Sequence, residues 1–80
     1  MRIDKYLKVT RLIKRRTVAN DACDGEKIEV NGKVVKASYQ VKVGDKIKIT
    51  FGNREMTVEV LNISEHVKKE DAGHMYRLID

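Results

Sequence analysis

The chain has 80 residues, with no tryptophan, no proline and one phenylalanine. This length fits one small domain with a core of aliphatic side chains, and we expect it to span residues 1–80. The single cysteine, Cys23, excludes an intramolecular disulfide and a cysteine-rich metal site, and we expect it to be a small buried residue. No apolar run is long enough for a signal peptide or a membrane span, so we expect a cytoplasmic protein.

The formal net charge of +5 is concentrated near the amino end of the chain. Residues 1–16 hold seven lysines and arginines and one acid, Asp4, for a net charge of +6. Residues 17–80 hold ten basic and eleven acidic residues, for a net charge of −1. Such a segment favours a polyanionic partner, because each neutralised phosphate releases condensed counterions.

The basic segment also has a helical pattern, which predicts a first short helix from residue 2 or 3 to about residue 9. Its apolar stripe is Ile3, Tyr6, Leu7 and Thr10. We expect Tyr6 to pack in the core rather than to stack on a base. Asp4, in the first turn, either complements the helix dipole or also holds a nearby arginine in one rotamer.

A second helix is predicted from residue 15 to about residue 24, after a connector at 10–14. Small side chains on one side of it allow close packing on the first helix: Val18, Ala19 and Ala22. The helix ends at Asp24-Gly25, and we place Gly25 at the left-handed position that follows a helix.

From residue 27 the hydrophobic period changes to two, which predicts strands. Ile28 and Val30 precede Asn31-Gly32, a strong hairpin signal, and 33–35 is the return strand. A loop at 36–40 and a turn at Gly44-Asp45 follow.

Residues 46–51 and 54–60 predict a second hairpin around Gly52-Asn53. One register satisfies both faces of this hairpin. It pairs Phe51 with Arg54, Ile49 with Met56, Ile47 with Val58, Lys48 with Thr57 and Lys46 with Glu59.

The last part of the chain is weakly patterned. Ser64 is placed to cap a short helical turn within 64–72, and residues 75–79 predict a closing strand. The order of elements predicts an α+β fold, with two short packed helices followed by a small, mostly antiparallel sheet.

No constellation for catalysis is evident, and we expect a binding protein without metal or cofactor. His66 and His74 are too isolated for a metal site, and no nucleophile motif or glycine-rich phosphate loop is present. We expect the two histidines to be solvated at the surface, and we expect four acids to be ordinary surface carboxylates: Asp24, Glu26, Glu70 and Asp71.

Several segments together resemble the S-four-type RNA-binding domain with its αL motif. They are RIDKYL at 2–7, RRTVA at 15–19, GEKIEVNGKVV at 25–35 and VGDKI at 43–47. The resemblance covers about residues 1–50 and leaves a carboxyl-terminal hairpin and tail at 51–80.

Longer stretches, including the tail KKEDAGHMY, are similar to the ribosome-associated quality control P-site factors of Gram-positive bacteria. They are less similar to the small heat-shock ribosome-binding protein of proteobacteria. The resemblance implies binding to large-subunit ribosomal RNA and peptidyl-tRNA on stalled large ribosomal subunits. It also implies support for C-terminal alanine tailing by a tail-elongating factor of the NEMF type. We expect the chain to act as a monomer.

By position, the resemblance implies an RNA-facing set made up of Arg2, Asp4, Lys5, Lys8, Arg11, Lys14, Arg15 and Arg16. Arg16 is the first choice, because the family motif meets RNA where the second helix starts. Lys14 departs from the serine that is frequent in the wider family before that helix. We expect these residues to contact phosphates and 2′-hydroxyls, since the major groove of A-form RNA hides its base edges.

Three alternatives stay open. The first is a general ribosome-binding factor in subunit assembly or recycling. The second is a detached accessory domain of an RNA-modifying enzyme, and the third is a DNA-binding helix pair. The last is disfavoured, because the second helix carries mostly Val, Ala and Asp beyond Arg16 instead of base-reading side chains.

Overall fold

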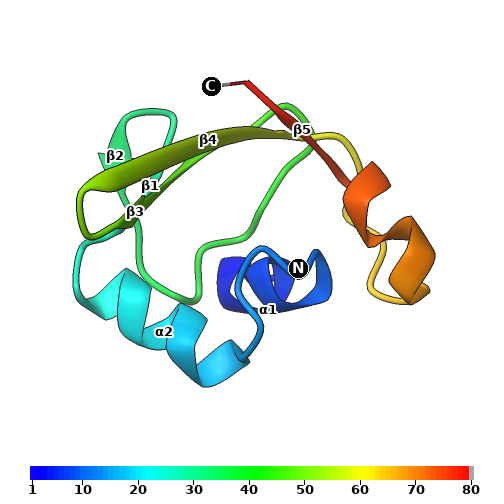
Figure 1. Cartoon of the computed structure of the whole chain (residues 1–80), viewed down its shortest axis with the longest axis horizontal. Helices are drawn as coiled ribbons and strands as arrows, with labels where there is room; N and C mark the ends of the chain where they lie inside the picture. Colours follow the sequence, from blue (N-terminus) through cyan, green and yellow to red (C-terminus); the bar gives the residue numbers. More distant parts are fainter. Residues whose placement is uncertain (80) are drawn as a thin grey trace.

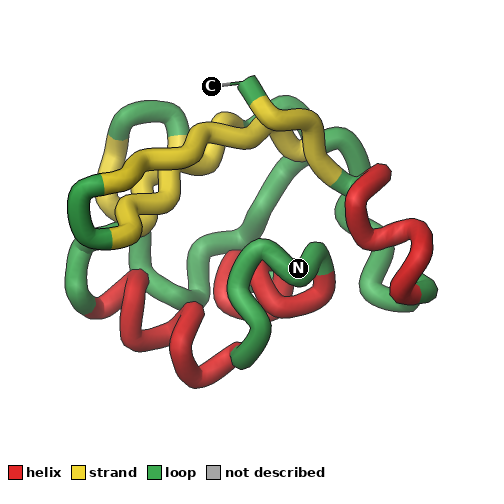
Figure 2. Tube along the Cα trace, in the orientation of Figure 1, coloured by secondary structure: helices red, strands yellow, loops and turns green. Residues whose placement is uncertain are grey.

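A computed structural model describes residues 1–79. Two helices, α1 (Ile3–Val9) and α2 (Arg16–Asp24), cover one face of a five-stranded antiparallel sheet (Figure 1). The strand order is β2-β1-β3-β4-β5, for strands β1 (Ile28–Val30), β2 (Lys33–Val34), β3 (Lys46–Phe51), β4 (Arg54–Val60) and β5 (Tyr76–Leu78). A 3-10 helix, η1 (Lys69–His74), precedes β5. The α+β prediction is confirmed, and Figure 2 shows the helices and the sheet as two layers.

The predicted register of the second hairpin is confirmed at every pair. Phe51 lies opposite Arg54, and Ile47 lies opposite Val58. Ile47, Ile49 and Val58 are fully buried and face the helices. The first hairpin is also confirmed, because Asn31 and Gly32 have φ values of 52° and 86°, as its turn requires.

The connector between β2 and β3 runs along α1 and fixes the start of the chain. The Ile3 amide donates to the Tyr39 carbonyl over 2.8 Å, and the Val41 amide donates to the Met1 carbonyl over 2.9 Å. Between these bonds, Arg2 and Gln40 form an isolated antiparallel bridge. The backbone of Arg2 is therefore held on a folded segment instead of a free tail.

The end of α2 differs from the prediction by one residue. Gly25 has a φ of −82°, and the left-handed residue is Glu26, with a φ of 61°. The Glu26 amide donates to the Cys23 carbonyl, and the Lys27 amide donates to the Ala22 carbonyl, at 3.1 and 2.9 Å. These two bonds form a Schellman motif, so the chain reverses one residue after the glycine.

The buried side of α2 is also rotated from the predicted one. Ala19 and Cys23 are buried, whereas Val18 is 51% exposed. Residues four apart lie on one helical face, so a contact through 19 and 23 turns residue 18 outward. The small side chains still lie at the helix contact. Burial, followed by the charges of Asp4 and Asp24, raises the pKa of the Cys23 thiol to about 11, as expected for a buried, unreactive cysteine.

The part of the chain that follows β4 packs against α1, so the two ends of the chain are in contact. The predicted closing strand is confirmed as β5, but Ser64 does not cap the helical turn. Its amide instead donates to Asn62 Oδ1 over 2.8 Å, and η1 begins only at Lys69. Among residues 1–79, no helix is long and apolar enough to span a membrane.

Candidate RNA-binding surface

Asp4 is the centre of a polar cluster that joins both helices. It lies in the first turn of α1, and its side chain is only 3% exposed. Its carboxylate accepts hydrogen bonds from Arg2 Nη2 at 3.3 Å and Arg16 Nη2 at 3.4 Å. It also accepts from Asn20 Nδ2 at 3.4 Å and from the Lys5 amide at 2.8 Å. We call the two arginines and this carboxylate the Asp4 clamp.

The pKa of Asp4 reflects this clamp. Burial alone raises the pKa of the carboxyl group, because it disfavours the charged form. Hydrogen bonds from Asn20, Arg16 and the Lys5 amide, with the charge of Arg16, outweigh burial and hold the pKa below its ordinary value. Asp4 is therefore an anion at neutral pH, and it orients arginines as well as occupying the first helical turn.

Both arginines of the clamp remain accessible. The side chain of Arg2 is 45% exposed and that of Arg16 is 47% exposed. A guanidinium has five N–H donors, so one bond to Asp4 leaves others for solvent or a ligand. The clamp therefore presents two fixed positive groups at the surface. Arg2 immediately precedes α1, and Arg16 is the first residue of α2.

Lys5 lies in a different environment from the clamp. Its Nζ is 2.7 Å from Glu65 Oε1, in the segment that follows β4. This hydrogen bond, together with the charge of Lys5, lowers the pKa of Glu65. Sequence reasoning missed both Glu65 and Asn20 as partners of the basic residues. Asn20 carried one usable signal, because it lies four residues after Arg16 on the same helical face.

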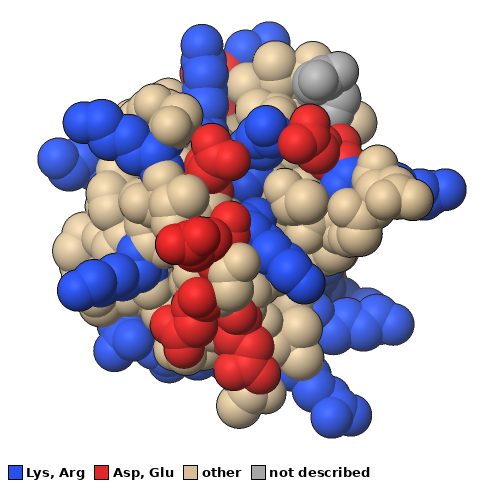
Figure 3. Space-filling model, turned by 90° about the vertical axis from the view of Figure 1, so that its left-hand side faces the viewer, with Lys and Arg blue, Asp and Glu red and all other residues tan. Residues whose placement is uncertain are grey.

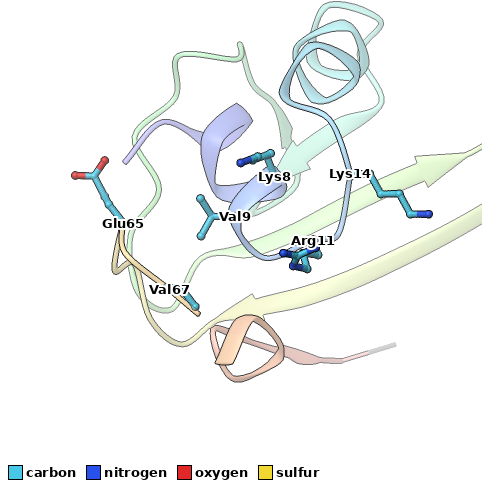
Figure 4. A pocket seen from close by; sticks show the side chains of 6 residues that line it. All are labelled: Lys8, Val9, Arg11, Lys14, Glu65 and Val67. Atoms are coloured by element: carbon cyan, nitrogen blue, oxygen red, sulfur yellow. The ribbon is translucent and has the colours of Figure 1, made fainter. Parts of the chain in front are cut away.

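Three further basic residues surround a hollow of about 420 Å³ at the other end of α1. Lys8 and Val9 come from α1, Arg11 and Lys14 from the loop after it, and Glu65 and Val67 from the segment after β4 (Figure 4). Arg15 precedes α2 and is exposed. The seven basic residues are thus divided between the Asp4 clamp, the Lys5–Glu65 pair, this hollow and exposed Arg15.

The surface charge is not uniformly positive. Seen from the side shown in Figure 3, acidic side chains form a column in the middle of the face, and lysines and arginines surround it. A phosphate chain is repelled by such a column. The centre of this face is therefore unfavourable for contact with a polyanion.

Tyr6 is part of the core, as predicted. Its side chain is fully buried, and its hydroxyl donates to the Met75 carbonyl over 2.7 Å. Burial, with a smaller contribution from Tyr76, raises the pKa of the Tyr6 hydroxyl. His66 and His74 are exposed, and residues 1–79 contain no group of three metal-ligating side chains.

Comparisons with known proteins identify the family of this chain. The S4 domain family matches residues 1–47. The chain is 52% identical over 79 residues to the "RQC P-site tRNA stabilizing factor" of Streptococcus pneumoniae, covering 99% of this chain and 90% of that protein. It is 47% identical over 79 residues to the protein of that name from Bacillus subtilis, covering 99% and 92%.

Solved structures have the same fold. The trimeric structure of Vibrio cholerae heat shock protein 15 matches with a TM-score of 0.89 and 32% identity, over 98% of this chain and 80% of that one. The solution structure of the hypothetical protein HP1423 matches with a TM-score of 0.84 and 33% identity, over 100% and 98%. The chain therefore carries an S4 domain and belongs to the family of the RQC P-site tRNA stabilizing factors.

Proposed function

We propose that this protein is a non-catalytic RNA-binding factor of the large ribosomal subunit that stabilises the P-site tRNA. The observation that carries the proposal is the Asp4 clamp, which holds guanidinium groups from two segments in one relative position. Relatives named for this role align with nearly the whole chain, so their role is a reasonable model for this one.

The mechanism is recognition of the RNA backbone. A guanidinium that is already oriented loses little freedom when it meets two phosphate oxygens, and its planar fork fits them. Asp4 acts as a positioning residue for Arg2 and Arg16 and does not itself meet a phosphate. The proposed RNA-binding set remains that of the sequence, with Asp4 in this positioning role and seven basic residues facing the RNA: Arg2, Lys5, Lys8, Arg11, Lys14, Arg15 and Arg16.

The finer parts of the proposal follow from the resemblance. We infer that the RNA partners are large-subunit ribosomal RNA and the peptidyl-tRNA of a stalled large subunit. The protein then supports C-terminal alanine tailing by a tail-elongating factor of the NEMF type, in the cytoplasm and without a cofactor. We also infer that it acts as a monomer. Because the Vibrio cholerae neighbour is described as trimeric, sedimentation velocity at rising concentration tests this point, and a trimer overturns it.

The test of the main proposal is cosedimentation with large subunits that carry peptidyl-tRNA. Arg16→Ala is expected to weaken binding roughly tenfold or more, because it removes charged hydrogen bonds to phosphate. Arg54→Ala, in the β3–β4 hairpin, removes the same charge from an exposed arginine and serves as the matched control. If a folded Arg16→Ala protein cosediments as well as wild type, the assignment of the clamp is wrong.

Salt dependence gives an independent readout. With about five phosphate contacts, the logarithm of the binding constant falls against the logarithm of salt concentration with a slope of roughly −4. Loss of Arg16 reduces the magnitude of that slope by about one. Competition with duplex DNA separates this proposal from a DNA-binding helix pair, since a partner recognised by A-form geometry is not displaced by B-form DNA.

A further inference from the structure

We propose that Asp45 is a second positioning residue of the Asp4 clamp, and that it acts through the connector that holds the backbone of Arg2. The connector, residues 35–45, links β2 to β3 and passes α1 (green in Figure 1). Asp4 orients the side chain of Arg2, whereas Asp45 fixes the segment on which the backbone of Arg2 lies. The inference rests on the proposed RNA-binding function and adds to it a residue from outside the basic segment.

The first step is the burial of the Asp45 carboxylate. Among residues 1–79, Asp4 and Asp45 are the two buried acids, and Asp45 is 7% exposed. Its Oδ2 accepts hydrogen bonds from the Tyr39 hydroxyl and from the Lys42 amide, both at 2.9 Å. Its Oδ1 accepts from Asn31 Nδ2 at 3.2 Å. A buried carboxylate is costly unless donors satisfy it, so these bonds hold the group in one place.

The second step is the attachment of Asp45 to the sheet. The Val60 amide, at the end of β4, donates to the Asp45 carbonyl over 2.8 Å. Asn31, in the turn between β1 and β2, accepts from the Lys46 amide through its Oδ1 over 3.0 Å. The Asn31 amide in turn donates to the Lys46 carbonyl over 2.9 Å. Asp45 therefore belongs to a rigid base made of the first hairpin turn and the ends of β3 and β4.

The third step joins this base to the amino end of the chain through Tyr39. The hydroxyl of Tyr39 donates to Asp45, and its carbonyl accepts from the Ile3 amide over 2.8 Å. The next residue, Gln40, forms the antiparallel bridge with Arg2. One residue thus connects the buried acid at one end with the backbone of the clamp at the other.

The connector needs this link because it lies outside the strands. Two backbone hydrogen bonds within it close short turns, from the Tyr39 amide to the Lys36 carbonyl and from the Asp45 amide to the Lys42 carbonyl, each at 3.0 Å. Neither bond fixes Tyr39 relative to Asp45. The hydrogen bond between their side chains does so, and it raises the pKa of the Tyr39 hydroxyl, with a smaller contribution from burial. Without the link the backbone of Arg2 gains freedom, which phosphate binding then has to remove.

The inference predicts the opposite of a simple charge effect. Asp45→Asn removes a negative charge, and that change alone favours binding of a polyanion. We instead expect this variant to lose affinity for large subunits that carry peptidyl-tRNA, by roughly threefold or more. The reason is that a neutral amide oxygen is a weaker acceptor for the Tyr39 hydroxyl than a carboxylate. Cosedimentation at rising protein concentration measures the change, and an unchanged or higher affinity overturns the inference.

Tyr39→Phe is a milder variant, because it removes one hydroxyl and keeps the ring. We expect it to weaken the same binding by roughly threefold to tenfold. This effect is expected to disappear in an Arg2→Ala background, which keeps the backbone bridge but lacks the guanidinium. It is expected to persist in a Lys14→Ala background, because Lys14 lies in the loop after α1. Equal effects in all three backgrounds, or no effect in any, overturn the inference.

Tyr6→Phe is the matched control for a loss of stability. It also removes one tyrosine hydroxyl, which donates to the Met75 carbonyl and touches neither the connector nor the clamp. We expect its affinity for large subunits to equal that of wild type. If Tyr6→Phe weakens binding as much as Tyr39→Phe does, the effect is one of general stability and the positioning role is wrong.

Hydrogen exchange on the protein alone separates this inference from the proposed function. In Tyr39→Phe, the Ile3 amide is expected to exchange roughly threefold or more faster, because its acceptor is the Tyr39 carbonyl. The amides of β3 and β4 are expected to keep their wild-type rates. Unchanged exchange at Ile3 overturns the inference, even where RNA binding is intact. If exchange changes as expected but wild-type protein binds no large subunits, the proposed function falls and the link from Asp45 to the amino end stands.

Discussion

Two carboxylates, Asp4 and Glu65, face the basic amino-terminal residues in different ways. The side chain of Asp4 is 3% exposed and accepts hydrogen bonds from three side chains and one backbone amide. The side chain of Glu65 is 54% exposed and binds one lysine. Both have a lowered pKa, but they differ in solvent access and in the number of donors.

The difference indicates two roles for acids in a basic surface. A buried carboxylate with several donors fixes the geometry of the cations, because few alternative arrangements satisfy it. An exposed carboxylate with one partner mainly reduces the local positive potential, since water and salt compete for its bond. We therefore infer that Asp4 fixes the geometry of the clamp, whereas Glu65 lowers the positive potential of the hollow beside Lys8.

The largest expected effect comes from removing the buried acid. Asp4→Ala leaves Asn20 and the Lys5 amide without their acceptor, and we expect the free energy of unfolding to fall by about 1–3 kcal/mol. Urea denaturation measures the change. Glu65→Ala is the control, and we expect its denaturation midpoint to match that of wild type. Equal midpoints for Asp4→Ala and wild type contradict the structural role of Asp4.

The same contrast appears in the dependence of stability on pH. Because the pKa of Asp4 is lowered from its ordinary value of 3.8, its contribution is fully present above that pH. It is lost as pH falls below 3.8 through the pKa of the folded state. Asp4→Asn is therefore expected to reduce the fall in the free energy of unfolding at acid pH. Glu65→Gln is expected to retain most of that fall. Parallel acid limbs for wild type and Asp4→Asn would reject the assignment.

The sequence predicted the sheet better than it predicted these acids. The register of the second hairpin followed from local alternation, because Ile47, Ile49 and Val58 have one face available to bury. For Asp4 the sequence left two roles open, since a partner twelve residues away depends on how two helices pack. The position of Glu65 beside Lys5 depends on how the segment after β4 packs against α1, and no local sequence pattern predicts that packing.

The errors were small and have local causes. Gly25 was assigned the left-handed conformation because glycine favours it, whereas the chain continues one residue further and Glu26 takes it. Val18 was expected inward because it is apolar, but the contact through Ala19 and Cys23 sets the rotation of α2. The concentration of positive charge was evident from the sequence. Its division between the Asp4 clamp and the hollow beside Lys8 required the packed structure.

An intermediate effect is expected where the tail is joined to α1. Tyr6→Phe removes the hydrogen bond from the Tyr6 hydroxyl to the buried Met75 carbonyl, and we expect it to lower the free energy of unfolding by roughly 1 kcal/mol. Because we propose that residues 1–80 fold as one unit, the variant should keep a single transition. Two separate transitions by fluorescence and circular dichroism would show that the tail unfolds independently.

The smallest expected effect concerns Glu65, and it distinguishes the two acids most directly. Glu65→Gln removes a negative charge from the lining of the hollow beside Lys8 and releases Lys5. Both changes favour a polyanion, so we expect RNA affinity to rise roughly twofold to fivefold at low salt. The gain should disappear at high salt, since an exposed charge is screened there. Ser64→Gln, next to Glu65, adds the same amide without removing a charge and is the matched control. A loss of affinity in Glu65→Gln would mean that the Lys5–Glu65 pair orders the surface as Asp4 does, and the distinction between the two carboxylates would fail.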